Sequence, residues 1–147
     1  MANAPKSVRD SITAAFRYFG ENAHEIVRID YESYDYSLYF NDLQNRDVSD
    51  EVSVAEVVGL FSALAKRAVL PGLVICGRVV MSGSMMPLTA DLTETLVIAA
   101  NAGAKRIMLP VECKTQYDEI KSKLFDKIEV IFYTTPLDAA RKALGVN

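Results

Sequence analysis

The chain has 147 residues, of which 50% are apolar, and a formal net charge of −3 at pH 7. A chain of this length and composition can bury a core of ordinary size as one domain. The acidic balance gives no global attraction to a polyanion, so this domain alone is expected to bind neither DNA nor an acidic membrane surface strongly.

The first half of the sequence predicts two helices separated by a strand and a loop. The apolar spacing of one helix face predicts a helix over about 8–23, with Ser7 as a possible N-cap. Apolar and polar residues then alternate over 34–40, the period of a half-buried strand, and the polar stretch 41–50 is predicted to be a loop. A second amphipathic helix is predicted over 54–65, ending before a Pro-Gly pair that cannot extend it.

The middle of the chain predicts a strand region and a helix with clear end signals. Residues 73–81 are expected to form one strand or a bent pair of strands, closed by a turn at 82–83. Asp91 can cap a third helix because Glu94 follows it at the capping-box spacing. Gly103 can end this helix, since glycine readily adopts the left-handed conformation that follows a helix C-terminus.

Strands and helices alternate in the last third of the chain. We predict strands over 106–109 and 128–133, with a helix near 116–124 between them. Thr135 as N-cap, followed by a proline at the first helical position, predicts a last helix that runs to about Leu144. This alternation favours a mixed or largely parallel sheet with packed helices, so the predicted fold class is α/β or α+β.

The cysteines and the apolar runs bear on the cellular location. Cys76 and Cys113 are far apart in sequence and have no second Cys or His at ligand spacing, which argues against a zinc cage and a disulfide framework. The apolar runs fall short of the roughly 20 residues of a membrane span, and segment 1–7 lacks the apolar core of a signal peptide. We therefore expect a cytoplasmic protein without a membrane partner, and interpret the nondescript lead 1–5 as a sign that the sequence was cut from a longer one.

Several segments resemble the proteolytic domain of Lon peptidases. Residues 76–87 are similar to its pattern of strand, Gly, second strand, Gly, two apolar residues and Pro, and residues 101–110 resemble the Lon segment that follows. Residues 132–140 and 142–146, and more weakly 16–19, resemble the Lon-like proteins of BREX phage-defence systems. The resemblance spans nearly the whole chain and implies a Lon proteolytic-domain-like fold over 1–147.

The resemblance also implies partners that lie outside this chain. BREX Lon-like proteins carry an AAA+ ATPase ahead of this domain and assemble as rings that engage DNA. We therefore expect self-association in a ring in the full-length protein, DNA contact only through other domains, and ATP only in a preceding AAA+ module. The chain has no Gly-x-x-x-x-Gly-Lys-Ser/Thr loop to hold a nucleotide phosphate, so no cofactor is expected in it and it is not itself the ATPase.

Lon peptidases use a serine nucleophile whose proton is taken by a buried lysine, and the resemblance places the serine at the start of the second helix. An ungapped alignment with the family places the serine position at Asp50, and an alignment with small gaps places it at Ser49 or Ser53. The Gly-Pro-Ser-Ala motif of the family is missing, because residues 41–51 contain neither glycine nor proline. Ser53 also stands three residues before Glu56, the spacing of a capping box, and we interpret it as a helix cap.

The lysine of the family is replaced in this sequence. It is expected seven or eight residues after Pro87, where this chain has Glu94 or Thr95. Residues 79–104 contain no lysine or arginine, so no small alignment error restores the base. The only histidine, His24, has the setting of a solvated helix-end residue.

Two further groups allow more than one interpretation. Asp47, Asp50 and Glu51 could form a metal or acid/base cluster, but acidic residues near a helix start also stabilise the helix dipole, and we favour that interpretation. The tyrosines within 31–39 could stack on bases, yet they are interleaved with acidic residues that would repel phosphate. A half-buried strand or a protein interface is the favoured interpretation.

These observations support one function and leave an alternative open. The first is a non-catalytic, Lon-like assembly or interaction domain of a BREX-type AAA+ ATPase in phage defence. The alternative is a Lon-like serine peptidase that uses Ser53 or Ser49 with an atypical base. A generic binding module unrelated to Lon is a third reading with less support.

Overall fold

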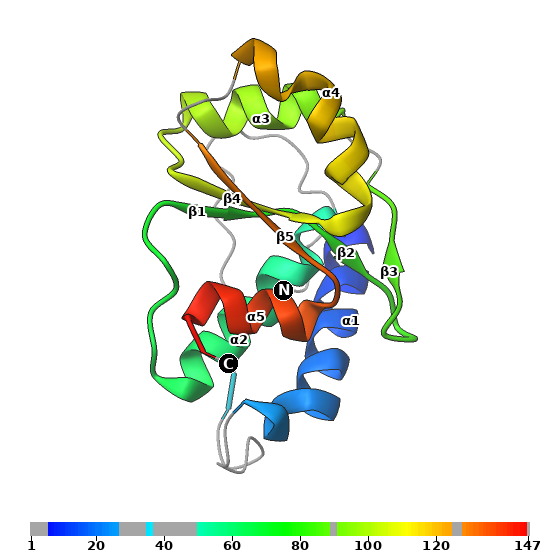
Figure 1. Cartoon of the computed structure of the whole chain (residues 1–147). Helices are drawn as coiled ribbons and strands as arrows, with labels where there is room; N and C mark the ends of the chain where they lie inside the picture. Colours follow the sequence, from blue (N-terminus) through cyan, green and yellow to red (C-terminus); the bar gives the residue numbers. More distant parts are fainter. Residues whose placement is uncertain (1–5, 27–34, 37–49, 89–90, 125–127, 147) are drawn as a thin grey trace.

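The computed structural model describes residues 6–26, 35–36, 50–88, 91–124 and 128–146 (Figure 1). The predicted strand at 34–40 lies outside these residues except for 35–36, which belong to no helix or strand. The predicted loop over 41–50 also lies outside them, except for Asp50, which begins a short 3₁₀ helix. Within the described residues, no helix combines the length and the apolar character needed to cross a membrane.

The main sheet of the described residues is parallel and three-stranded, in the order β1-β4-β5. Its strands are β1 (Leu73–Ile75), β4 (Arg106–Pro110) and β5 (Glu129–Tyr133). A small antiparallel sheet pairs β2 (Arg78–Val79) with β3 (Met85–Met86). The region predicted as one strand or a bent pair is therefore a bent pair whose halves belong to two different sheets.

One face of the parallel sheet is covered by helices from both ends of the chain (Figure 1). These helices are α1 (Lys6–Asn22), α2 (Ser53–Ala65) and α5 (Pro136–Leu144), with the 3₁₀ helices η1 (Ala23–Glu25) and η3 (Asp50–Val52) beside them. α2 packs against both α1 and α5. The buried side chains of this layer meet the sheet at Met108 and Tyr133.

The other face of the sheet is covered by α3 (Leu92–Asn101) and α4 (Lys114–Leu124), and η4 (Val111–Cys113) leads into α4. Leu92, Leu96 and Ala99 of α3 share a buried cluster with Ile107 and Leu109 of β4. Because neighbouring residues of a strand point to opposite faces, Met108 lies in one core while Ile107 and Leu109 lie in the other. This three-layer arrangement confirms the predicted α/β class.

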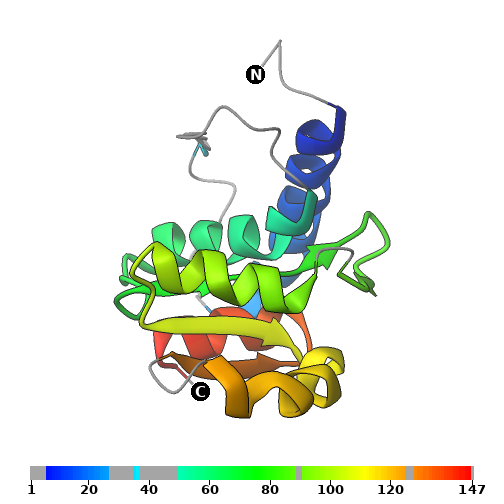
Figure 2. The same ribbon diagram turned by 90° about the horizontal axis from the view of Figure 1, so that it is seen from above.

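The small sheet lies at the edge of the molecule, beside α1, in both views (Figure 1 and Figure 2). The predicted turn at 82–83 closes this hairpin, since the Gly83 N–H donates to the Val80 carbonyl at 2.8 Å. Gly83 has φ +86°, which favours glycine at this position. β3 consists of the two methionines that precede Pro87 in the Lon-like pattern.

The helix ends show where local sequence signals decide the structure. Asp91 caps α3 by accepting the Thr93 N–H at 2.9 Å, and Gly103 follows the helix with φ +83°. Thr135 caps α5 by accepting the Asp138 N–H at 3.0 Å. These predictions are confirmed. The cap predicted at Ser7 is wrong, because α1 begins one residue earlier and includes this position in its first turn.

Candidate functional site

The hydroxyl group of Ser53 is bound to the backbone of β2. Ser53 is the first residue of α2 and is 0% exposed. Its Oγ accepts the backbone N–H of Val79 at 2.8 Å and lies 3.4 Å from the Val79 carbonyl oxygen. The N-cap of α2 is Val52, with no side-chain hydrogen bond, so the interpretation of Ser53 as a helix cap is wrong. The serine instead joins the first turn of α2 to the neighbouring strand.

Glu56, the other half of the expected capping box, also points away from the start of its helix. Glu56 is only 6% exposed, and its Oε1 is 2.7 Å from the hydroxyl oxygen of Ser11 on α1. Burial raises the pKa of the Glu56 carboxyl to about 7, against an opposing effect of the Ser11 hydrogen bond. The capping-box spacing is therefore present in the sequence but is used for two tertiary contacts.

Gly77 lies at the junction of α2, β2 and the end of β5. Its N–H donates to the Glu51 carbonyl at 3.0 Å, and its carbonyl accepts the Val54 N–H at 3.3 Å. The Tyr133 hydroxyl donates to the carbonyl of the preceding Cys76 at 2.6 Å. A Cβ at position 77 would overlap the Tyr133 hydroxyl and lie 2.8 Å from Val54 Cγ2. Close approach of three elements therefore requires glycine at this position.

The positions expected for the lysine lie on α3 and carry a glutamate and a threonine in its place. Glu94 is exposed, and the Thr95 hydroxyl donates to the Asp91 carbonyl at 2.9 Å within its own helix. Thr95 borders a cavity of about 220 Å³ between α3 and the β3 region. The other lining residues are Met85, Met86, Pro87, Leu88, Leu92, Pro110, Glu112, Cys113 and Gln116. Ser53 is not part of this lining, so the cavity does not bring the two candidate positions together.

The two cysteines, which sequence reasoning set aside, influence each other at the ends of β1 and β4. Burial raises the pKa of Cys76 to about 11, with smaller contributions from Glu51 and Cys113. The pKa of Cys113 is also raised, by burial and then by Glu112 and Glu51. Both are free thiols. Because the thiolate is the reactive form, these raised pKa values make both thiols poor nucleophiles near neutral pH.

A sequence signal for this proximity does exist. Each cysteine follows a strand of the same parallel sheet, and the carboxyl ends of such strands meet at one edge. In the described part of the chain, no group of three or more His, Cys, Asp and Glu side chains has a metal-binding arrangement.

The remaining candidates are dispersed. His24 lies in η1, its side chain is 74% exposed, and its Nε2 is 3.2 Å from a Glu25 carboxylate oxygen. η1 follows the end of α1 that points away from the sheet (Figure 1), whereas Ser53 contacts β2. Ser49 and Asp47 lie outside the described residues.

Only one tyrosine of the segment 31–39 lies within the described residues. Tyr36 is half-buried and packs edge-on against Phe16 and Phe19 of α1, with ring centroids 6.2 and 5.2 Å away. This aromatic ring therefore contributes to the core beside α1. This position agrees with the half-buried interpretation for Tyr36.

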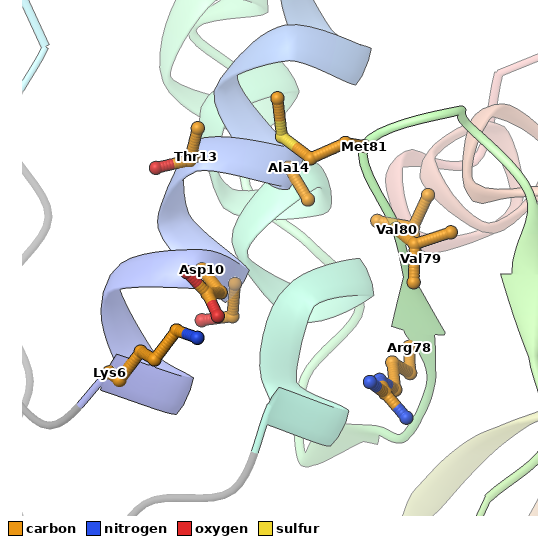
Figure 3. A pocket seen from close by; sticks show the side chains of 9 residues that line it. Lys6, Asp10, Thr13, Ala14, Arg78, Val79, Val80 and Met81 are labelled. Atoms are coloured by element: carbon orange, nitrogen blue, oxygen red, sulfur yellow. The ribbon is translucent and has the colours of Figure 1, made fainter.

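A larger cavity of about 550 Å³ separates α1 from β2 (Figure 3). Its α1 side carries Lys6, Asp10 and Ser11, and its β2 side carries Arg78 and the apolar residues that follow. The lining thus combines charges of both signs with an apolar wall. Ser53 does not line this cavity either.

Comparison with known proteins identifies relatives along almost the full length. Residues 5–145 match the family of the Lon protease (S16) C-terminal proteolytic domain. The chain is 32% identical over 142 residues to the Lon-like protease BrxL of Escherichia coli O9:H4 (strain HS), covering 96% of this chain and 20% of that protein. It is 30% identical over 146 residues to the Lon-like protease BrxL of Bacillus cereus (strain H3081.97), covering 99% of this chain and 21% of that protein.

A more distant relative is the Lon protease of Desulfosudis oleivorans, which is 25% identical over 142 residues, covering 95% of this chain and 17% of that protein. The chain spans about a fifth of the length of the two BrxL proteins that it matches.

Proposed function

We propose that this chain, which belongs to the Lon protease (S16) C-terminal proteolytic domain family, is a non-catalytic assembly and interaction domain of a BREX-type AAA+ ATPase in phage defence. Its similarity to two BrxL proteins over 96% and 99% of its length supports the choice of system. The observation that carries the non-catalytic role is the complete burial of Ser53, whose hydroxyl is bound to the backbone of β2.

The chemistry of acyl transfer explains why this observation matters. A serine nucleophile must reach the substrate carbonyl and must pass its proton to a base within hydrogen-bond distance. The Ser53 hydroxyl contacts the two backbone polar atoms of Val79 and no described basic side chain. Among the described residues, the cavity beside Thr95 has no lysine in its lining that could act as a base of the Lon type.

Peptide turnover tests this role directly. The chain should not hydrolyse casein or fluorogenic peptides, and Ser53→Ala and Ser49→Ala should leave the background rate unchanged. Ser84→Ala, at an exposed position in the β2–β3 turn, is the matched control for removal of a hydroxyl group. Turnover that disappears with Ser53→Ala or Ser49→Ala but persists with Ser84→Ala would instead establish the alternative function, a serine peptidase with an atypical base.

Assembly is the second part of the proposal and needs its own test. A domain retained without its chemistry has another use, and ring contact between neighbouring copies would provide one. An ATPase ring raises the effective concentration of the domains that it carries, so the isolated chain is expected to be monomeric or weakly associated in dilute solution. Light scattering over a concentration series should show this, while the longer ATPase-containing protein should form rings. A longer protein that stays monomeric with nucleotide and DNA present would exclude the assembly role.

A further inference from the structure

Glu56 is a buried carboxyl group at the contact between α1 and α2. It is 6% exposed, and Ser11, its hydrogen-bond partner on α1, is 3% exposed. The second carboxyl oxygen, Oε2, is buried and has no hydrogen-bond partner among the described residues. A carboxylate in such a place lacks most of the donors that water would supply, and burying it in that form is costly.

The hydrogen-bond geometry around Ser11 allows the proton to be placed. The Ser11 hydroxyl oxygen is 2.7 Å from Glu56 Oε1 and 2.8 Å from the carbonyl oxygen of Val8. A hydroxyl group has one proton to donate. If Glu56 is ionised, both neighbours are acceptors and compete for that proton. If Glu56 is neutral, its own proton goes to the Ser11 oxygen, Ser11 donates to Val8, and both short contacts are hydrogen bonds.

No charged partner among the described residues compensates the carboxylate. The elements that pack on α2 are α1, β2, η3 and α5. Their charged groups include Lys6, Arg9 and Asp10 on α1, Arg78 on β2, Asp50 and Glu51 in η3, and Asp138, Arg141 and Lys142 on α5. Within the described part of the chain no ion pair involves Glu56, and its raised pKa has burial as its main cause with no contribution from these charges.

We propose that Glu56 is a proton-dependent latch between α1 and α2: the neutral acid donates to Ser11 and closes the contact, and ionisation reverses this hydrogen bond and weakens the contact. On ionisation the Ser11 hydroxyl turns from Val8 to Glu56 Oε1, and the carboxylate keeps one buried oxygen without a donor. Ser11 also lines the large cavity between α1 and β2. The latch therefore controls how α1 is held beside that cavity.

The direction of the pH effect follows from the two states of the chain. The pKa of Glu56 is about 7 in the folded chain against an ordinary value of 4.5, so the folded chain holds this proton at higher pH than the unfolded chain. The stabilising contribution is complete below pH 4.5 and is lost as the pH rises to 7. Across this window the unfolding equilibrium constant should rise by up to about tenfold per pH unit because of this one group.

A carboxyl-detected NMR titration of the 147-residue chain tests the placement of the proton without any substitution. The Glu56 side-chain carbon should titrate near pH 7, well above the ordinary glutamate value of 4.5. A Glu56 midpoint at or below 4.5 would overturn the proposal.

Glu56→Gln tests the latch itself, because a neutral amide can donate to Ser11 at every pH. In this variant the unfolding equilibrium constant should no longer rise as the pH increases towards 7, as it does in the parent. Glu119→Gln makes an equal charge change at an exposed position of α4 and should keep this rise. A Glu56→Gln variant with the same pH dependence as the parent would show that no latch exists. If the variant does not fold, the NMR midpoint alone decides.

Discussion

The starts of α2 and α3 have similar capping signals in the sequence and different structures. Asp91 keeps its side chain on its own helix and accepts the Thr93 N–H at 2.9 Å. At α2, Ser53 binds the Val79 N–H of β2, Glu56 binds Ser11 of α1, and the N–H of Val54 is satisfied by the carbonyl of Gly77. The start of α3 is at the exposed Asp91, whereas the start of α2 is buried. A buried helix start can use tertiary partners in place of a side-chain cap, because nearby strands and loops supply donors and acceptors that must be paired.

The most damaging change to the α2 junction should be Gly77→Ala. The added methyl group would overlap the Tyr133 hydroxyl and crowd Val54, at a residue whose N–H and carbonyl are both hydrogen-bonded. Overpacking of this kind costs about 3 kcal/mol of the free energy of unfolding, or more where the backbone cannot move. Urea denaturation measures the loss.

Two matched variants sharpen this prediction. Gly59→Ala lies in the same helix, where an added Cβ meets nothing within 4 Å, and should stabilise the chain by about 0.5–1 kcal/mol. Tyr133→Phe combined with Gly77→Ala removes the overlapping hydroxyl and should recover part of the lost stability. Gly77→Ala as stable as the parent would mean that the junction is not tightly packed.

Ser53→Ala should be the next largest effect at α2. The substitution leaves the buried N–H of Val79 without its acceptor, which costs about 1–3 kcal/mol. Chemical denaturation measures the loss in free energy of unfolding. Hydrogen exchange locates this loss, because the Val79 amide should be the first to lose protection. Ser84→Ala, at an exposed turn position, should stay within about 0.5 kcal/mol of the parent. Unchanged exchange at Val79 would contradict the contact between α2 and β2.

The sequence could predict those parts of the structure that depend on neighbouring residues. Asp91 with Gly103, and Thr135 with its following proline, mark helix ends correctly because the capping partners lie within a few residues. The bend between β1 and β2 follows from the glycine between two apolar runs. The predicted N-cap at Ser7 is wrong because the helix begins one position earlier, a shift that local sequence signals do not resolve.

The site depends on contacts that the sequence pattern does not contain. The partner of Ser53 is 26 residues away and that of Glu56 is 45 residues away, so neither could be inferred from spacing along one helix. The capping-box pattern gave a sufficient local explanation for both residues, and the tertiary contacts replaced it. The approach of Cys76 and Cys113 likewise depends on the order of strands in the sheet.

Asp91→Ala should break the cap of α3 at a smaller cost than the changes at α2. The Thr93 N–H would lose its side-chain acceptor at an exposed helix start, where water can replace it, so the expected loss is about 1 kcal/mol. Asp91→Asn keeps an acceptor and should retain most of the stability. Thermal and urea denaturation of the two variants provide the comparison. A loss at Asp91→Ala larger than that at Ser53→Ala would reverse the ranking of the two helix starts.

The smallest effect is expected for Thr95→Lys, which places a lysine at a position where the Lon resemblance expects one. Thr95 donates only to the Asp91 carbonyl within α3 and is half-buried beside the cavity, so the free energy of unfolding should change by less than about 1 kcal/mol. Peptide turnover should remain absent, because the hydroxyl of the candidate nucleophile Ser53 is buried against β2 and is not accessible to substrate. Glu94→Lys at the neighbouring exposed position controls for the added charge. A fluorogenic peptide assay together with denaturation checks both expectations. Turnover gained by Thr95→Lys and removed again by adding Ser53→Ala would show that the serine can leave β2. The start of α2 would then be an active site.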